Sequence, residues 1–458
     1  MSFILPSFLA SRDLLFASGQ IQAVETRELW RMWRGYCRQH AGAALTDGLD
    51  RLVAADVPDT PRLRHWCTVT KAMLRAYRRG VDANPGDIAH FELDSLAPER
   101  LTQLHSLRLL EIFVGNPVHT TQHNFSLRLR TPAMPLRLEL GRAGRLTPVE
   151  ADRHLAWDLS VDNEEIVIRT GRESELQCVT SSSGICLTFP RDWKYEPSFE
   201  VRYGEQCLHI PIYDAGLCNP HAGATALIVR NPRAILEWQP MLSRALDCSG
   251  SADADLHAEC LSYLSDVLPL YHGLGQLFGS ASTEQALGYA FLPGILSPLD
   301  IAECFVHEAM HQKLFRLEQV LPLFESGSPT EETYYSPWRR DSRPLRMVLH
   351  GCFVFTHVVY LWLEWAKNPP AELASPAEAW KVAYRRSCEV LAGLDLLARY
   401  SLPTEHGTRL LSEMQDIVAR LTENAPIEPE YRIEVNAAVA AHRQHHIETS
   451  LCSDPLTF

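Results

Sequence analysis

The sequence predicts an α+β protein that is mostly helical, with a central antiparallel β-sheet region and a C-terminal helical domain. Near both ends of the 458-residue chain, apolar residues recur every three or four positions, as in amphipathic helices. In the middle they alternate with polar residues, as in half-buried strands. Helical and strand patterns in separate segments are typical of an α+β fold. We expect three regions, at 1–116, 117–231 and 232–458.

The first region, 1–116, shows the helical pattern. Trp30, Trp33 and Tyr36 recur at spacings of three, and a second series with spacings of three and four begins at Leu63. Aromatic residues at helical spacing are more typical of a core than of a binding surface. We therefore expect these helices to pack around their aromatic residues.

The second region, 117–231, shows the strand pattern. Its clearest strand-like segments are 125–130, 136–140, 165–169, 185–189, 199–203 and 208–212. Short polar and glycine-containing segments separate them and predict turns. Strands joined by such turns predict an antiparallel sheet.

In the third region, 232–458, the pattern returns to helices. We expect helices near Asp253–Gly279, Pro298–Leu321, Arg343–Ala366, Pro376–Arg399, Thr404–Leu421 and Glu430–His446. The segment Phe324–Asp341 contains Gly327, Pro329 and Pro337, which predict a loop between two of these helices.

Composition excludes several classes of function. The net charge of -13 does not favour a general nucleic-acid surface. The 12 cysteines form no CxxC pair, which argues against a zinc ribbon and for reduced thiols in a cytoplasm. The apolar N-terminus has no basic leader, and the longest apolar run, Gly351–Trp362, is too short to span a bilayer. We expect a cytoplasmic protein without membrane contact; the sequence does not predict its oligomeric state.

An HExxH sequence lies inside one of the predicted helices. His307 and His311 are four residues apart, so their imidazoles share one helical face, and Glu308 follows the first of them. Ser297 or Asp300 can cap the start of this helix. The spacing predicts that both rings bind one metal ion, with Glu308 as a base or a carboxylate beside the ligands. The alternative is a pair of histidines that only fills the core.

The next helix offers a third ligand. Residues three, four and seven apart share a helical face, so Arg343, Arg346, His350 and His357 lie along one otherwise apolar stripe. Such groups are unfavourable in a core unless they pair or bind something. We expect His350 to be the third metal ligand and His357 to lie in the core or behind a ligand.

Carboxylates are the alternative third ligands. Glu331, Glu332 and Asp341 follow the HExxH helix, and a glutamate would complete the two-histidine, one-glutamate set of zinc peptidases. The longer HExxHxxGxxH form is absent, because Leu314 and Leu317 occupy its glycine and third histidine positions.

Basic residues cluster between this loop and the next helix. They are Arg339, Arg340, Arg343 and Arg346. A zinc peptidase has no intrinsic need of several guanidinium groups beside its metal. An iron oxygenase that uses 2-oxoglutarate needs one to bind the distal carboxylate. Tyr335 could add a hydroxyl donor. The alternative is that one or two of these arginines only pair with Asp341 or Glu318.

Three segments together resemble a known family. They are His-Glu-Ala-Met-His at 307–311, Tyr-Ser-Pro-Trp-Arg-Arg-Asp-Ser-Arg-Pro-Leu at 335–345 and Leu-His-Gly-Cys-Phe-Val-Phe at 349–355. This combination resembles the HEXXH-motif domain of bacterial peptide-natural-product clusters, over about 292–362. Met347 departs from the pattern, where a small residue such as glycine is expected.

The resemblance implies a 2-oxoglutarate-dependent, non-haem iron peptide β-hydroxylase that modifies a ribosomally made precursor peptide. His307, His311 and His350 would bind Fe(II), and Glu308 would orient a ligand or substrate. The co-substrate would contact an arginine of the 338–346 segment, with Arg339, Arg343, Arg346 and Tyr335 as candidates. Two rival hypotheses remain. One is a zinc metallopeptidase with Glu308 as general base. The other is a non-catalytic peptide-binding protein whose strands pair with a leader peptide.

Overall fold

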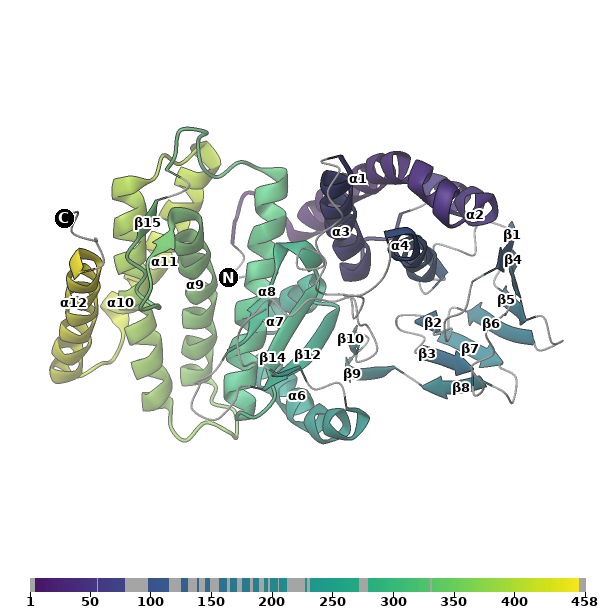
Figure 1. Cartoon of the computed structure of the whole chain (residues 1–458). Helices are drawn as coiled ribbons and strands as arrows, with labels where there is room; N and C mark the ends of the chain where they lie inside the picture. Colours follow the sequence, from purple (N-terminus) through teal and green to yellow (C-terminus); the bar gives the residue numbers. More distant parts are fainter. Residues whose placement is uncertain are drawn as a thin grey trace.

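The chain forms an α+β structure in which helices predominate. The computed structural model describes residues 5–55, 57–78, 98–114, 125–130, 138–139, 145–148, 156–162, 165–170, 175–181, 184–188, 193–196, 198–204, 206–211, 227–228, 231–271, 279–329 and 332–452. Figure 1 shows the N-terminal helices and the strands β1–β8 on one side and the C-terminal helices on the other. Helix α8 and a mixed sheet lie between them. The expected fold class is confirmed at this level.

The N-terminal helices pack around an aromatic core. They are α1 (Ser11–His40), α2 (Ala43–Ala55), α3 (Pro61–Arg78) and α4 (Pro98–Val114). Trp33 is fully buried and donates its indole N–H to Ser106 Oγ (2.9 Å), and Trp66 donates to the carbonyl of His105 (2.9 Å). Each buried indole therefore keeps a hydrogen-bond partner. The expected aromatic core is confirmed for Trp30 and Trp33.

Two antiparallel sheets follow in the chain. One has the order β1-β4-β5-β6-β7, with bounds Phe125–Arg130, Ala156–Asp162, Glu165–Thr170, Glu175–Ser181 and Gly184–Thr188. The other has the order β2-β3-β8, with bounds Leu138–Glu139, Arg145–Pro148 and Trp193–Glu196. The alternating pattern sets the register, which places Leu127 of β1 opposite Leu159 of β4.

The third sheet is mixed. Its order is β13-β14-β12-β10-β9, and β11 also pairs with β12. The bounds are β9 Phe199–Tyr203, β10 Gln206–Ile210, β11 Leu227–Ile228, β12 Asp266–Tyr271, β13 Ala281–Ser282 and β14 Tyr289–Pro293. Within the expected region 117–231, β9 and β10 pair antiparallel as expected, but β12, which lies beyond that region, runs parallel to β10 and β14. The sheet also joins strands from both sides of residue 231.

The expected helix at Asp253–Gly279 was wrong over Asp266–Tyr271, which form β12, and its part at 272–278 lies outside the described residues. Val267, Leu268 and Leu270 are all buried, so this strand reads as a continuous apolar run. Such a run cannot be distinguished from a buried helix by periodicity. Only α7 (Ala254–Tyr263), capped by Asp253, falls within the expected helix.

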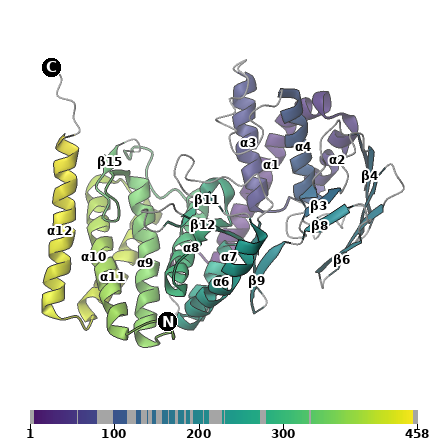
Figure 2. The same ribbon diagram turned by 60° about the horizontal axis from the view of Figure 1, so that its bottom comes forward.

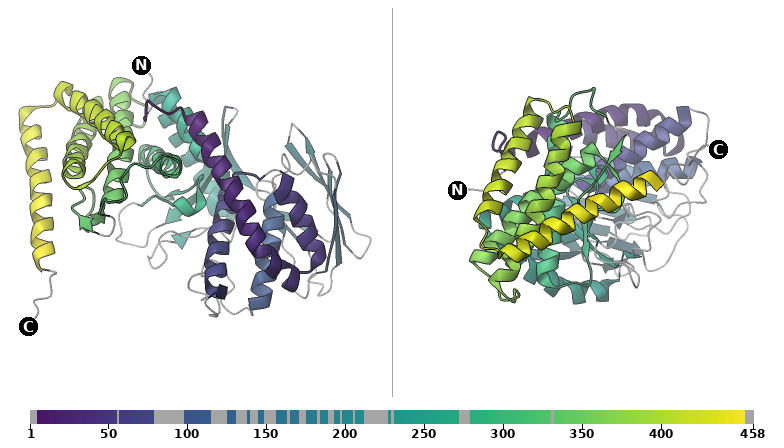
Figure 3. Two further views of the ribbon diagram at one scale, coloured as in Figure 1. Left: turned by 90° about the horizontal axis from the view of Figure 1, so that it is seen from above. Right: turned by 90° about the vertical axis from the view of Figure 1, so that its left-hand side faces the viewer.

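The remaining elements are mostly helices. They are α6 (Pro232–Ala252), α8 (Pro298–Val320), α9 (Leu345–Lys367), α10 (Pro376–Tyr400), α11 (Glu405–Asn424) and α12 (Pro429–Cys452). A short ribbon of β15 (Thr333–Tyr334) and β16 (Arg343–Pro344) connects α8 to α9. Figures 2 and 3 show α12 at the outer edge of this group, beyond α10. The last five expected helices are confirmed to within a few residues.

Helix α8 is the centre of the molecule. The hydroxyl of Ser297 caps it by accepting from the backbone N–H of Asp300 (3.2 Å), and Pro298 occupies its first turn. It packs against α1, α6, α7, α9 and β14. Among the described helices, α9 alone is long and apolar enough to cross a membrane, and most of that apolar stretch is buried inside the protein.

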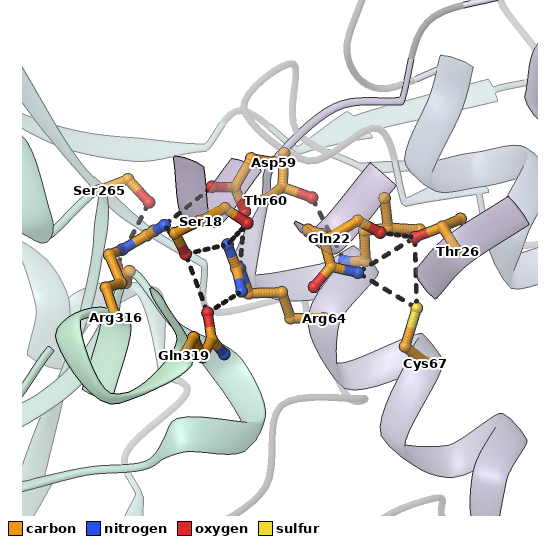
Figure 4. A network of polar contacts seen from close by, with 12 residues as sticks. Ser18, Gln22, Thr26, Asp59, Thr60, Arg64, Cys67, Ser265, Arg316 and Gln319 are labelled. Carbon is orange, nitrogen blue, oxygen red and sulfur yellow. Dashed lines mark hydrogen bonds and ion pairs between the residues drawn. The ribbon is translucent and has the colours of Figure 1, made fainter. Parts of the chain in front are cut away.

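A polar network joins α8 to the N-terminal helices (Figure 4). Asp59 precedes α3 and accepts hydrogen bonds from Arg64 of α3 (2.6 Å) and Arg316 of α8 (2.8 Å). Ser18 of α1 contacts both guanidinium groups and also donates to Gln319. Both arginines are buried, and paired charges are the form in which a core tolerates them. The network therefore fixes α8 against the N-terminal helices.

Candidate metal centre

The two HExxH histidines face each other on α8. Their Nε2 atoms are 3.2 Å apart, and the rings meet edge to face with centroids 4.8 Å apart. Burial lowers the pKa of His307 to about 3, and the charge of Arg386 acts in the same direction. Burial, and then the neighbouring histidines, lower the pKa of His311 well below its usual value. Both imidazoles are therefore neutral at pH 7, the form that binds metals.

The distance between these nitrogens fits a shared ion. Two imidazoles on one zinc-sized ion, each about 2.0–2.1 Å from it, have nitrogens roughly 3.4 Å apart in tetrahedral geometry. The observed 3.2 Å is close to that value, although it also suits a direct hydrogen bond between the rings. His307 and His311 are both only partly buried.

His350 of α9 meets His311 from the other side. Its Nδ1 lies 3.0 Å from Nδ1 of His311, and its Nε2 lies 3.1 Å from Oε2 of Glu318. Glu318 also accepts from Arg346, whose Nε lies 3.1 and 3.0 Å from its two oxygens. Burial alone would raise the pKa of Glu318, but the hydrogen bonds from His350 and Arg346 hold it below its usual value.

The three histidines touch but do not converge on one point. His311 turns Nε2 toward His307 and Nδ1 toward His350, and these nitrogens lie on different edges of its ring. Within the described residues, no group of three or more histidine, cysteine, aspartate or glutamate side chains is arranged to hold one ion. His307 and His311 therefore fit a metal as a pair, and the three-histidine set remains a prediction.

Glu308 lies beside this pair in a nearly closed environment. It is 2% exposed, and its Oε1 accepts a hydrogen bond from Ser280 (2.5 Å). Its second oxygen has no hydrogen-bond partner among the described residues. Burial raises the pKa of Glu308 to about 7, against the effect of the nearby hydroxyl groups. A carboxyl group with such a pKa can take up or release a proton near neutral pH.

Three of the four predicted arginines are paired with carboxylates. Arg339 and Arg343 pair with Asp341 at 3.2 and 2.7 Å. Arg346 pairs with Glu318 and, at 2.6 Å, with Glu284. Pairing with Asp341 or Glu318 is what the sequence offered as the alternative to co-substrate binding, whereas the pairing with Glu284 was not expected. Arg343 differs from the others because its Nε has no hydrogen-bond partner among the described residues.

The other candidates make contacts with residues outside the histidine pair. The hydroxyl of Tyr335 lies 3.1 Å from Nδ1 of His442 in α12. Glu332 accepts from the hydroxyl of Tyr334, and Glu331 is outside the described residues. His357 is fully buried in α9, with Nδ1 2.8 Å from the carbonyl of Phe353. Among the described residues, Glu318 is the carboxylate that forms a hydrogen bond with one of the three site histidines, His350.

An aromatic wall supports His307. Its ring meets Phe355 of α9 edge to face, with centroids 4.9 Å apart. Phe355 in turn stacks on Trp338 (5.0 Å), and the guanidinium of Arg386 lies 4.8 Å from the same ring. The wall therefore restricts the orientation of His307 and shields it from solvent.

Sequence reasoning missed several residues that shape this centre. Glu318 was expected only as a partner for an arginine; its contact with His350 could have been found, because it follows His311 by seven residues and so lies on the same face of α8. Ser280, Phe355 and Arg386 carry no local signal, since only the packing of β13, α9 and α10 brings them to the HExxH segment.

Comparison with known proteins gives no relative: no family model matches the chain, and no curated protein has a similar sequence.

Proposed function

We propose that this chain is a non-haem iron, 2-oxoglutarate-dependent peptide β-hydroxylase that acts in the cytoplasm on a ribosomally made precursor peptide. The observation on which this proposal mainly rests is that Nε2 of His307 lies 3.2 Å from Nε2 of His311. The resemblance of the segments 307–311, 335–345 and 349–355 to the HEXXH-motif family supports the choice of chemistry.

An iron oxygenase and a zinc peptidase each use three protein ligands, so the two histidine nitrogens that the described residues bring together do not separate the two functions. The arginines between the HExxH helix and the next helix favour the oxygenase, because its co-substrate carries a second carboxylate to bind. A 2-oxo acid chelates an ion through its keto and carboxylate oxygens, so the co-substrate itself supplies two further donors. With 2-oxoglutarate and dioxygen, iron at such a site supplies the hydroxylation of a peptide side chain.

The protein side chains have distinct parts in this proposal. His307 and His311 supply neutral imidazoles, and the ring of Phe355 keeps water from one side of His307. Glu308 holds or releases a proton beside the ligands.

Arg343 is the arginine best suited to the distal carboxylate of the co-substrate. Its ion pair with Asp341 is partly exposed, with the two side chains 33% and 56% exposed. An exposed pair contributes little stability, so another carboxylate can replace Asp341 at small cost. Arg346, in contrast, already binds two carboxylates.

The second candidate is a zinc metallopeptidase. The observation that favours it is the buried Glu308, whose pKa of about 7 suits a general base. This function requires a third protein ligand, for which the sequence offers Glu331, a residue outside the described part of the chain.

One assay separates the two functions. The protein is reconstituted with Fe(II) without oxygen, then mixed with 2-oxoglutarate, oxygen and a precursor peptide encoded beside its gene. We expect succinate and a peptide that gains one oxygen atom. His307→Ala should abolish both products, whereas His406→Ala, at an exposed position of α11, should retain them. Zinc-dependent peptide cleavage that Glu308→Gln abolishes, without succinate, would establish the peptidase.

A further inference from the structure

A chain of four side chains runs from the HExxH histidines to the surface. It starts at His311, passes through His350 and Glu318 and ends at Arg346, with contacts of 3.0 Å, 3.1 Å and 2.7 Å. His350 is fully buried, and Arg346 is 42% exposed. The chain therefore connects the buried side of the candidate metal centre to a partly solvated ion pair.

Arg346 determines which atoms donate and which accept along this series of side-chain contacts. Arg346 donates to both oxygens of Glu318, and a carboxylate that neutralises a guanidinium has only acceptors to offer. The contact at Oε2 of Glu318 therefore requires His350 to carry its proton on Nε2. Nδ1 of a neutral His350 is then an acceptor.

The proton of His311 can be placed by the same reasoning. Only one of the two Nδ1 atoms in this 3.0 Å contact carries the shared proton, and a ligand His311 whose Nε2 lone pair faces an ion carries its single proton on Nδ1, so His311 is the donor. A neutral His311 with its proton on Nδ1 has a bare lone pair on Nε2. That nitrogen is the one that faces His307.

We infer that Glu318 and His350 are positioning residues that fix the tautomer and ring orientation of His311, so that its Nε2 is presented as a metal ligand. This inference rests on the proposed metal centre and changes the expected role of His350 from ligand to support. Residues that hydrogen-bond to the second nitrogen of a ligand histidine commonly raise metal affinity 10–100-fold.

The protein contains a matched control for the positioning role of Glu318. Glu284 binds the same guanidinium of Arg346 at 2.6 Å, but it pairs with that arginine and not with a histidine. Replacing Glu284 therefore removes an equal charge from the same arginine and leaves the contacts of His350 and His311 intact. Of the two variants, Glu318→Gln changes the carboxylate that contacts His350, whereas Glu284→Gln does not.

The first test is an anaerobic Co(II) titration of the full chain, followed by visible absorption. We expect Glu318→Gln to weaken binding about 10–100-fold with one ion still bound at saturation, and Glu284→Gln to bind like the unchanged protein. His350→Ala should also weaken binding and keep the single ion. Equal affinities for the two glutamine variants would overturn the inference, as would complete loss of the ion in His350→Ala, which would make His350 a ligand.

The second test needs no metal. Ring ¹⁵N chemical shifts of His311 in the metal-free protein report which nitrogen carries the proton. We expect the proton on Nδ1 in the unchanged protein and in Glu284→Gln, and a mixture of tautomers in Glu318→Gln. A proton on Nε2 in the unchanged protein would contradict the inferred order of donors from His311 to Glu318. If the unchanged protein binds no metal but shows the Nδ1 tautomer, the proposed function fails, whereas the inferred order of donors stands.

Discussion

Asp59 and Arg316 form an ion pair of 2.8 Å between the N-terminal helices and the helix that carries the HExxH sequence. They are 257 residues apart in the chain. Arg64 binds the same carboxylate, and both arginine side chains are at most 6% exposed. The N-terminal helices therefore pack as one unit with α8. Loss of this ion pair should also disturb the position of the candidate metal centre on α8.

Asp59→Asn should destabilise the protein on the order of 3 kcal/mol at pH 7, because it leaves two buried guanidinium groups without their carboxylate. Asp50→Asn is the control, since Asp50 pairs with the more exposed Arg34, a pair that contributes at most about 1 kcal/mol, and asparagine keeps an oxygen that can accept from the indole of Trp30. Urea unfolding of both variants measures the difference. Equal losses in the free energy of unfolding would show that the buried ion pair stabilises the protein no more than the exposed one.

The same pair predicts a pH dependence. Burial alone would raise the pKa of Asp59, but Arg64 and Arg316 hold it below its usual value. Its contribution is therefore complete above the unfolded pKa of about 3.9 and is lost as the pH falls through the folded value. Between pH 7 and pH 3 the unchanged protein should lose more stability than Asp59→Asn. Parallel loss in both proteins would contradict this assignment.

Glycines on two helices make room for the indole of Trp338. A Cβ added at Gly351 would lie 2.4 Å from Trp338 Cζ3, and one at Gly393 would lie 3.1 Å from Cη2. Gly351→Ala should displace the indole from Phe355 and cost about 1–3 kcal/mol, with a change in tryptophan fluorescence.

Gly35→Ala is the control for this prediction, because nothing lies within 4 Å of the added Cβ on α1. It should be neutral or stabilise by about 0.5–1 kcal/mol, since alanine favours a helix over glycine. If Gly351→Ala behaves in the same way, the indole does not depend on this space.

Lys313 of α8 forms a buried ion pair with Glu259 of α7 at 2.5 Å, with the two side chains 0% and 5% exposed. Lys313→Met should cost about 3–5 kcal/mol, because it leaves Glu259 buried and uncompensated. The double variant Lys313→Met, Glu259→Gln should recover much of this loss. A double-mutant cycle by thermal unfolding measures the coupling, and additive losses would show that the two residues do not act as a pair.

The sequence predicted what depends on neighbouring residues. Ser297, Pro298 and the four-residue spacing of His307 and His311 together indicated α8, its start and its histidine face, because helices are local structures. The pairings of Arg343 with Asp341 and of Arg346 with Glu318 were likewise among the sequence-based alternatives.

What the sequence could not predict depends on packing between distant segments. The apolar run that forms β12 has no periodicity of its own, so only its parallel neighbours β10 and β14 identify it as a strand. The contact of His350 with Nδ1 of His311, and not with the Nε2 that faces His307, depends on how α9 lies against α8. Helical spacing gives the face of a side chain but not which ring nitrogen it meets.

The central claim is that His307 and His311 share one metal ion, and metal content measures it most directly. The full chain is loaded with Fe(II) without oxygen, passed over a desalting column and analysed for bound metal. We predict one ion per chain, lost in His307→Ala and in His311→Ala and retained in His406→Ala. An unchanged metal content in both site variants, or no bound ion in the unchanged protein, would contradict the account.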